Sequence, residues 1–263
     1  MIESPTLTFY RTCLGENKAT RPSWYSKELC LKSFLLSFDK LNLEIKSELI
    51  VLVDGYLKPH DEWSKTIKTL IEPRGFIVEN PAVGNVESNI NIIRTASSLP
   101  ENRVVIFAED DYLWLALALL GLQHSLTELP VSYSTPYDHP VRYQPNYIKG
   151  ADLPHWHNSI YITKEGHWRT QESTCMTFAT TSRTLNEDIS YFENYRENGH
   201  GRPEDRELFR HLQGLGDYAN NILNKRILVG PIPSLATHAH LPWLAPLVDW
   251  EKEALAIFEQ KLI

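Results

Sequence analysis

The feature that most constrains this chain is an apolar run that ends in three consecutive acids. Val104–Ala108 holds no charge, and Glu109, Asp110 and Asp111 follow it directly. A run this apolar predicts a strand buried on both faces, whose carboxyl end is where open α/β sheets place a ligand crevice. Adjacent like charges repel one another, so we expect a positive partner, and a hard divalent cation is the natural candidate. The alternative is a solvated acidic turn that caps the next helix.

The chain around this run alternates short apolar strands with amphipathic helices. The predicted strands are 7–12, 47–54, 76–78 and 104–109, and the predicted helices are 27–41, 63–71, 89–97 and 112–123. We expect Ser88 to cap the third of these helices, whereas the fourth is too short for a membrane span and fits a core helix. The alternation predicts right-handed crossovers and a parallel sheet.

The second half of the chain breaks this pattern. Residues 130–147 are rich in proline, tyrosine and polar residues, which predicts an irregular surface segment. Residues 159–162 and 167–179 flank a turn and predict a β-hairpin. Further elements are expected at 184–194, 204–212 and 249–262 as helices and at 227–229 as a strand. Because this half adds to the sheet and does not repeat it, we expect a single domain over residues 1–263.

Composition and charge argue against several kinds of protein. The net charge is −7, from 26 basic and 33 acidic residues, so the chain has no excess of positive charge to attract nucleic-acid phosphates. The sequence lacks an apolar window of membrane-spanning length and a signal peptide. Its three cysteines are scattered, which suits a reducing compartment and argues against a thiolate zinc site. We therefore expect a cytoplasmic protein without a membrane span.

Four motifs together resemble the small glycosyltransferases of the GT-A fold. They are Gly84-Asn85-x-x-Ser88 before Glu109-Asp110-Asp111-Tyr112, then Tyr137-Asp138-His139-Pro140-x-Arg142-Tyr143, then Thr174-Cys175-Met176-Thr177-Phe178, and finally Pro233-Ser234-Leu235-Ala236-Thr237-His238. They are similar in order and spacing to motifs of bacterial and large-virus members of one such family, over about Tyr10 to Trp250. The resemblance implies one GT-A-like α/β domain with a Rossmann-like, mostly parallel sheet and helices on both faces. It places a nucleotide-sugar-binding half at 1–125 and an acceptor-side half, with a hairpin and helices, at 126–263.

The resemblance implies metal-dependent transfer of a sugar from a nucleotide-diphosphate donor to a hydroxyl of a glycan or another acceptor. UDP is the expected nucleotide, and Mn²⁺ or Mg²⁺ the expected cofactor, which stabilises the charge growing on the leaving diphosphate. In the family, the last acid of an Asp-x-Asp signature binds the metal, so Asp111 is the expected ligand. His238 resembles the second ligand. Glu109 departs from the signature, and either Glu109 or Asp110 is expected to contact the ribose or a metal-bound water.

Further donor contacts are expected where the first strands end, following the crevice rule. The residues placed to contact the base and ribose are Arg11, Thr12, Asp54, Asn85 and Ser88. For Asp54, which precedes Gly55, a simple strand-ending turn is an equal alternative.

Inverting transfer, the expected outcome, requires a general base on the acceptor hydroxyl. Glu204 and Asp205 resemble the acid pair that many inverting members carry at a helix N-terminus, and an ordinary helix cap is the alternative. Glu172 and Asp138 are the other candidates. Three aromatic residues would suit stacking on a sugar: Trp156, Trp168 and Tyr137.

Other functions remain as alternatives. A sugar-phosphate nucleotidyltransferase usually carries a glycine-rich, basic loop after its first strand, whereas residues 14–18 contain one glycine and an acid. A non-catalytic sugar-binding protein on the same fold would have no need of the intact acids and His238. A metal-dependent phosphohydrolase would need acids from several strand ends, and only Asp54 is a candidate.

Overall fold

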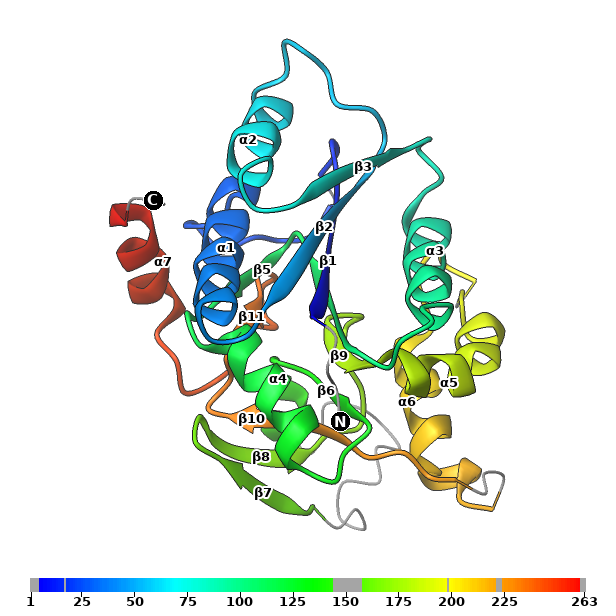
Figure 1. Cartoon of the computed structure of the whole chain (residues 1–263). Helices are drawn as coiled ribbons and strands as arrows, with labels where there is room; N and C mark the ends of the chain where they lie inside the picture. The colour runs from blue at the N-terminus through cyan, green and yellow to red at the C-terminus, as the bar shows by residue number, and fades with distance from the viewer. Residues whose placement is uncertain (1–4, 17, 144–157, 198, 221–223, 261–263) are drawn as a thin grey trace.

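A nine-stranded sheet forms the centre of the protein (Figure 1). The structure is a computed structural model that describes residues 5–16, 18–143, 158–197, 199–220 and 224–260. The strand order is β3-β2-β1-β4-β9-β6-β10-β8-β7. The strands of this sheet are β1 (Thr6–Cys13), β2 (Ser47–Asp54), β3 (Phe76–Asn80), β4 (Val104–Glu109), β6 (Tyr133–Ser134), β7 (Ile160–Thr163), β8 (Gly166–Thr170), β9 (Phe178–Thr181) and β10 (Leu228–Ile232). A second sheet pairs β5 (Tyr112–Trp114) with β11 (Ala236–His238).

Helices cover both faces of the large sheet (Figure 1). They are α1 (Lys27–Glu44), α2 (Glu62–Ile71), α3 (Asn85–Ser97), α4 (Ala118–Glu128), α5 (Ser182–Asn194), α6 (Asp205–Gln213) and α7 (Trp250–Glu259), with 3₁₀ turns η1 (Pro140–Tyr143) and η3 (Gly216–Tyr218). Buried side chains of α1, α2, α4 and α7 belong to one hydrophobic cluster, and those of α3, α5 and α6 belong to another. β4 contributes to both: Ile106 lies in the first cluster, and Val105 and Phe107 in the second. The prediction of a strand buried on both faces is therefore confirmed.

The first half of the chain forms the predicted parallel sheet. β1 pairs in parallel with β2 and β4, and β2 pairs in parallel with β3. β9, from the second half, lies antiparallel between β4 and β6, which makes the sheet mixed. The predicted fold class is confirmed: the chain is a single α/β domain with a large, mostly parallel mixed sheet flanked by helices.

The hairpin predicted over 159–179 is correct only in its first part. β7 and β8 pair as a hairpin at the edge of the sheet. Phe178–Thr181 is instead a separate strand, β9, whose partners lie far away in the sequence. A local pattern predicts an extended segment, but it does not reveal which distant strand pairs with it.

The helix predicted over 112–123 is wrong at its start. Tyr112–Trp114 is strand β5, and α4 begins only at Ala118. Tyr112–Trp114 is buried throughout. A short run of buried apolar residues has no hydrophobic periodicity by which a strand could be told from a helix. β11, the partner of β5, was not predicted either.

The surface segment predicted over 130–147 also contains core structure. Tyr133 lies in β6 and is fully buried, and Tyr137 is only 3% exposed. Residues 144–147 lie outside the described residues. Tyr133 and Tyr137 fill the core, because their rings bury large apolar areas, whereas Tyr143 is exposed as expected.

None of the helices in the described ranges is long and apolar enough to cross a membrane. The three cysteines are free thiols.

Candidate active site

The carboxyl ends of three parallel strands meet at one edge of the large sheet. β1 lies between β2 and β4, and the register pairs Arg11 with Glu109 and Cys13 with Asp54. Asp110 and Asp111 follow β4 directly. Most of the residues predicted to bind the donor therefore share one edge, the position where α/β sheets bind ligands.

Each of the three acids after β4 is paired with a different base. The ion pairs are Arg11 with Glu109 at 2.7 Å, Lys27 with Asp110 at 2.8 Å, and Arg21 with Asp111 at 3.0 Å. All three bases come from β1, α1 or the loop between them. The expected positive partners are therefore side chains of this chain. Sequence reasoning missed Arg21 and Lys27. Their only signal in the sequence was the run of three acids, which needs positive charge nearby.

Arg11 joins four of the predicted donor-binding residues into one hydrogen-bonded group. Its guanidinium donates to Glu109 through Nε and Nη2, to Ser88 Oγ at 2.6 Å and to Asn85 Oδ1 at 2.6 Å. Burial raises the pKa of Glu109 to about 7, and Arg11 only partly offsets this rise.

Ser88 is not the helix cap that we expected: α3 begins at Asn85, and its N-cap is Gly84, with φ of 88°. Ser88 lies buried within the helix and fixes the arginine.

Thr12 and Asp54, which were also predicted to contact the donor, bind neighbouring groups of the chain. Thr12 donates its hydroxyl to Asp110 Oδ2 at 2.6 Å. The Asp54 carboxylate accepts the backbone N–H groups of Val83 at 2.8 Å and Gly84 at 2.9 Å, which fixes the loop before α3. Asp54 therefore organises the turn that presents Asn85 and Ser88.

Asp111 and His238 are brought together by the small sheet. β11 pairs antiparallel with β5, so His238 lies opposite Tyr112 and stacks on its ring at 5.2 Å. His238 Nε2 then lies 3.0 Å from Asp111 Oδ2, although 127 positions separate the residues in sequence. Burial alone would raise the pKa of Asp111, but His238 and Arg21 hold it well below its usual range.

This pair has the chemistry and spacing of two neighbouring metal ligands. Ligands about 2.1 Å from an octahedral ion, at right angles to each other, are about 3 Å apart, and Asp111 Oδ2 and His238 Nε2 are 3.0 Å apart. Within the described part of the chain, no third acid, histidine or cysteine joins them. The two residues fit an ion that takes its other ligands from water and phosphate oxygens, as Mg²⁺ commonly does.

Asp205 lies close enough to this pair for His238 to act on it. It is the first residue of α6, and the N-cap position belongs to Glu204, whose side chain makes no capping hydrogen bond. Burial raises the pKa of Asp205 to about 7, against the lowering effect of the Arg206 N–H group and with a further rise from Glu204. His238 is close enough to act on this pKa as well. A carboxylate with this pKa suits proton abstraction near neutral pH.

The two other candidate bases are engaged in ion pairs. Glu172 accepts from Arg206 at 2.8 Å and also from Arg210. Asp138 is 1% exposed and accepts from Arg169 at 2.7 Å, from Gln171 at 3.0 Å and from Tyr143. Because both carboxylates are already engaged by charged side chains, these contacts favour Asp205 over both.

The aromatic residues expected to stack on a sugar are mostly core. Trp168 is fully buried and donates its indole N–H to Thr163 Oγ1 at 2.9 Å. Tyr137 is buried and donates to the backbone oxygen of Trp243. Trp156 lies outside the described residues.

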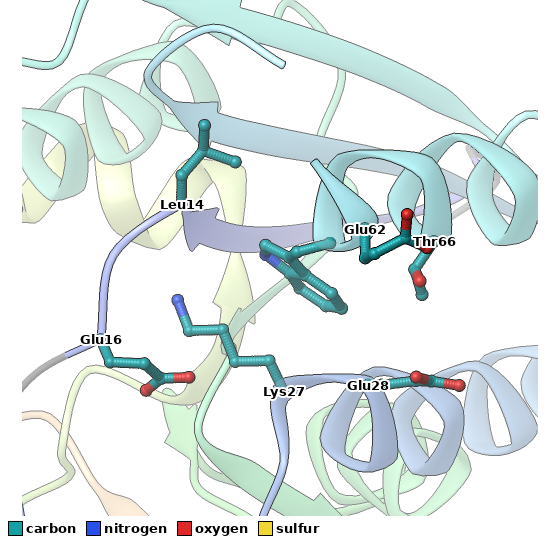
Figure 2. Close-up of a pocket in the computed structure, with 7 residues that line it drawn as sticks. Leu14, Glu16, Lys27, Glu28, Glu62 and Thr66 are labelled. Atoms are coloured by element: carbon teal, nitrogen blue, oxygen red, sulfur yellow. The ribbon is translucent and has the colours of Figure 1, made fainter. Parts of the chain in front are cut away.

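A pocket is lined by residues of α1, of α2 and of the loop after β1 (Figure 2). Its volume is about 240 Å³, and its lining residues are Leu14, Glu16, Lys27, Glu28, Glu62, Trp63 and Thr66. Lys27 connects it to the site, because the ammonium group of this lining residue pairs with Asp110 and donates to the Cys13 and Gly15 carbonyls. Lys27 therefore lies between this pocket and Asp110.

Comparison with known proteins gives a likeness in structure. No protein-family model matches the sequence, and no curated protein matches it either. Among solved structures, that of GalNAc-T7 with UDP, GalNAc and Mn²⁺ matches 97% of this chain with a TM-score of 0.54 at 9% identity. The match covers 47% of that chain, so the present chain spans about half its length. A structure of 4-diphosphocytidyl-2C-methyl-D-erythritol synthase matches 97% of this chain and 100% of its own, with a TM-score of 0.46 at 12% identity.

At 9% identity the likeness to GalNAc-T7 concerns the fold alone, and it agrees with the GT-A-like architecture described above. The arrangement of acids, bases and His238 at the carboxyl edge comes from this chain itself.

Proposed function

We propose that this protein is a metal-dependent glycosyltransferase that moves a sugar from a UDP-sugar to a hydroxyl of a glycan or another acceptor. The observation that carries the proposal is the Asp111–His238 pair at the carboxyl edge of a GT-A-like sheet. A carboxylate and an imidazole that approach within 3.0 Å beside paired acids and bases suit a divalent ion and an anionic donor. GalNAc-T7, the structure with the similar fold, was crystallised with UDP and Mn²⁺, which agrees with this choice of ligands.

Different residues of the site would bind the metal ion and the donor. Asp111 and His238 would hold the ion, which supplies Lewis-acid stabilisation of the leaving diphosphate when bound. Asp110, which is held by Thr12 and Lys27, would contact the ribose or a metal-bound water, the role for which Glu109 is the alternative. The group around Arg11 keeps α3 against the site, so that the donor meets a preorganised surface.

Asp205 would act as the general base in an inverting transfer. Its carboxylate takes the proton of the acceptor hydroxyl while that oxygen forms a bond to the anomeric carbon. The bond between the anomeric carbon and the phosphate oxygen breaks on the opposite face, and its electron pair leaves with the diphosphate. The raised pKa of Asp205 makes the carboxylate basic enough to accept the proton near neutral pH.

Ligand-induced stabilisation tests the proposal directly. UDP at about 100 times its Kd, with Mn²⁺ present, should stabilise the protein by about 2.7 kcal/mol, and EDTA should abolish the effect. Asp111→Asn should lose the Mn²⁺-dependent part, whereas Asp217→Asn, at an exposed position outside the site, should keep it. A parent protein that UDP stabilises equally with EDTA and with Mn²⁺ would overturn the metal-dependent assignment. Mn²⁺-dependent hydrolysis of UDP-sugar would then separate an enzyme from a non-catalytic sugar-binding protein.

A second candidate, nucleotidyl transfer to a sugar phosphate, gains support from one observation. Its expected basic loop after the first strand is partly present, because Arg21 and Lys27 both contact acids of the site. The two reactions differ in their products. A glycosyltransferase releases UDP from UDP-sugar, whereas a nucleotidyltransferase releases pyrophosphate from a nucleoside triphosphate and a sugar phosphate. Product analysis with both substrate pairs decides between them.

A further inference from the structure

Arg21 differs from the other two bases at the acids. Its Nη2 donates to Asp111 Oδ2 at 3.0 Å, and its Nη1 donates to the Ala239 carbonyl at 2.7 Å. The guanidinium also lies over the ring of Tyr25, at 4.4 Å from its centroid. Arg21 therefore links the loop before α1 to Asp111 and to Ala239, the residue that follows His238.

The contact of Arg21 falls on the atom that a metal would need. Asp111 Oδ2 accepts from Arg21 and is also the oxygen that lies 3.0 Å from His238 Nε2. Arg11 and Lys27 hold the other two acids and have further anchors, in α3 for Arg11 and in the carbonyls of Cys13 and Gly15 for Lys27. Of these three bases, only Arg21 shares the oxygen of a proposed metal ligand.

An arginine side chain can exchange a carboxylate partner for a phosphate partner. Its guanidinium carries five N–H donors in a planar fork that matches phosphate as well as carboxylate. The side chain is 14% exposed, and its contact with Ala239 would keep it beside the pair when the bond to Asp111 is lost. A diphosphate in this position adds negative charge next to the guanidinium.

We propose that Arg21 exchanges partners during the reaction: it neutralises Asp111 in the metal-free protein, and it donates to the β-phosphate of the donor diphosphate, the phosphate that carries the sugar, once the metal is bound. The inference rests on the proposed function, since it needs a diphosphate at Asp111 and His238. In the second state Arg21 stabilises the charge that develops on the leaving group. Arg21 thus acts as a cation that opposes metal binding alone and favours the complete complex of metal and donor.

Binding measurements that require no turnover test this exchange. Mn²⁺ affinity without nucleotide, measured by calorimetry, should become about 5-fold tighter in Arg21→Ala, because a competing ion pair is removed. UDP affinity at saturating Mn²⁺ should fall about 10-fold or more, the scale of a hydrogen bond to a charged group. UMP lacks the terminal phosphate, so its affinity should change far less. Arg21→Lys, which keeps the charge, should restore much of the UDP affinity.

Arg74→Ala is the matched control. Arg74 is also largely buried and pairs with Asp39, at a place away from the site, so its loss should leave all three affinities unchanged. A purely structural role for Arg21 predicts that UDP and UMP weaken together and that Mn²⁺ binding does not tighten; either result would overturn the exchange. A parent protein without Mn²⁺-dependent UDP binding would instead overturn the proposed function, and this proposal with it.

Discussion

Asp205 determines the pH dependence that we expect of the transfer reaction. Burial raises its pKa to about 7, and the groups that act on it are the Arg206 N–H, Glu204 and His238. A general base works only when deprotonated, so the rate at saturating Mn²⁺ and donor should rise with pH through about 7. Asp205→Asn should lower transfer by roughly 10²–10⁴-fold and remove this rise, with donor affinity nearly unchanged. If the variant keeps the parental rate, Glu204→Gln, Glu172→Gln and Asp138→Asn are the next tests.

The same carboxyl group should lower the stability of the protein at alkaline pH. An unfolded aspartate has a pKa of about 3.9, whereas that of folded Asp205 is raised to about 7. Between these values the folded state keeps a proton that the unfolded state has lost, so stability falls as the pH rises across this window. Asp205→Asn should therefore have a higher Tm than the parent at pH 8 and a similar Tm at pH 4. Equal values at pH 8, measured by calorimetry, would mean that the carboxylate is well solvated.

His238 should control how much metal the reaction needs. A metal takes the lone pair of a neutral imidazole nitrogen, and His238 Nε2 lies 3.0 Å from Asp111 Oδ2, where it could share an ion with that oxygen. His238→Ala should raise the Mn²⁺ concentration for half-maximal activity by about 10-fold or more. His167→Ala, at an exposed position in β8, is the control. An unchanged Mn²⁺ requirement would make His238 a structural residue that stacks on Tyr112.

Among the elements, α1 has a role beyond its apolar face. Ser33 Oγ accepts the backbone N–H of Trp114 at 3.0 Å, and Ser37 Oγ accepts that of Leu119 at 2.9 Å. Both serines are fully buried. Their hydroxyls satisfy backbone groups at β5 and at the start of α4, where the chain leaves one element for the next.

Removal of one of these hydroxyls should cost stability. Ser37→Ala would leave the Leu119 N–H buried without its acceptor, which typically costs about 1–3 kcal/mol. Chemical denaturation should show this loss, whereas Ser98→Ala, at an exposed helix end, should change stability by less than about 0.5 kcal/mol. A Ser37→Ala protein as stable as the parent would show that water or a local shift replaces the hydroxyl.

At the scale of the whole molecule, the two halves share one sheet. β9, from the second half of the chain, pairs directly with β4, and Phe178 of β9 packs on Phe107 with ring centroids 4.9 Å apart. Separation of the halves would therefore expose the centre of the sheet.

This arrangement predicts one cooperative unfolding transition, as in a single domain. Far-UV circular dichroism and tryptophan fluorescence should report the same denaturation midpoint, because neither half keeps a complete core alone. Two separated midpoints would contradict the prediction of one domain over residues 1–263.

The sequence by itself determined the parts of this protein that depend on local patterns. The alternation of apolar strands and amphipathic helices up to Glu109 predicted the parallel half of the sheet, because hydrophobic periodicity reflects which faces are buried. The position of the acids at a strand end placed the site at the carboxyl edge. Asp111 and His238 were paired in advance only by the resemblance to known glycosyltransferases.

Only the tertiary structure decided the contacts between distant segments. It inserted β9 between β4 and β6, made a strand of Tyr112–Trp114, and brought His238 to Asp111 across 127 positions. It also assigned Arg11, Lys27 and Arg21 one to each acid. The physical reason is that charge pairing and strand pairing act through space, and neither leaves a periodic trace in the sequence, whereas burial of a helix or strand face does.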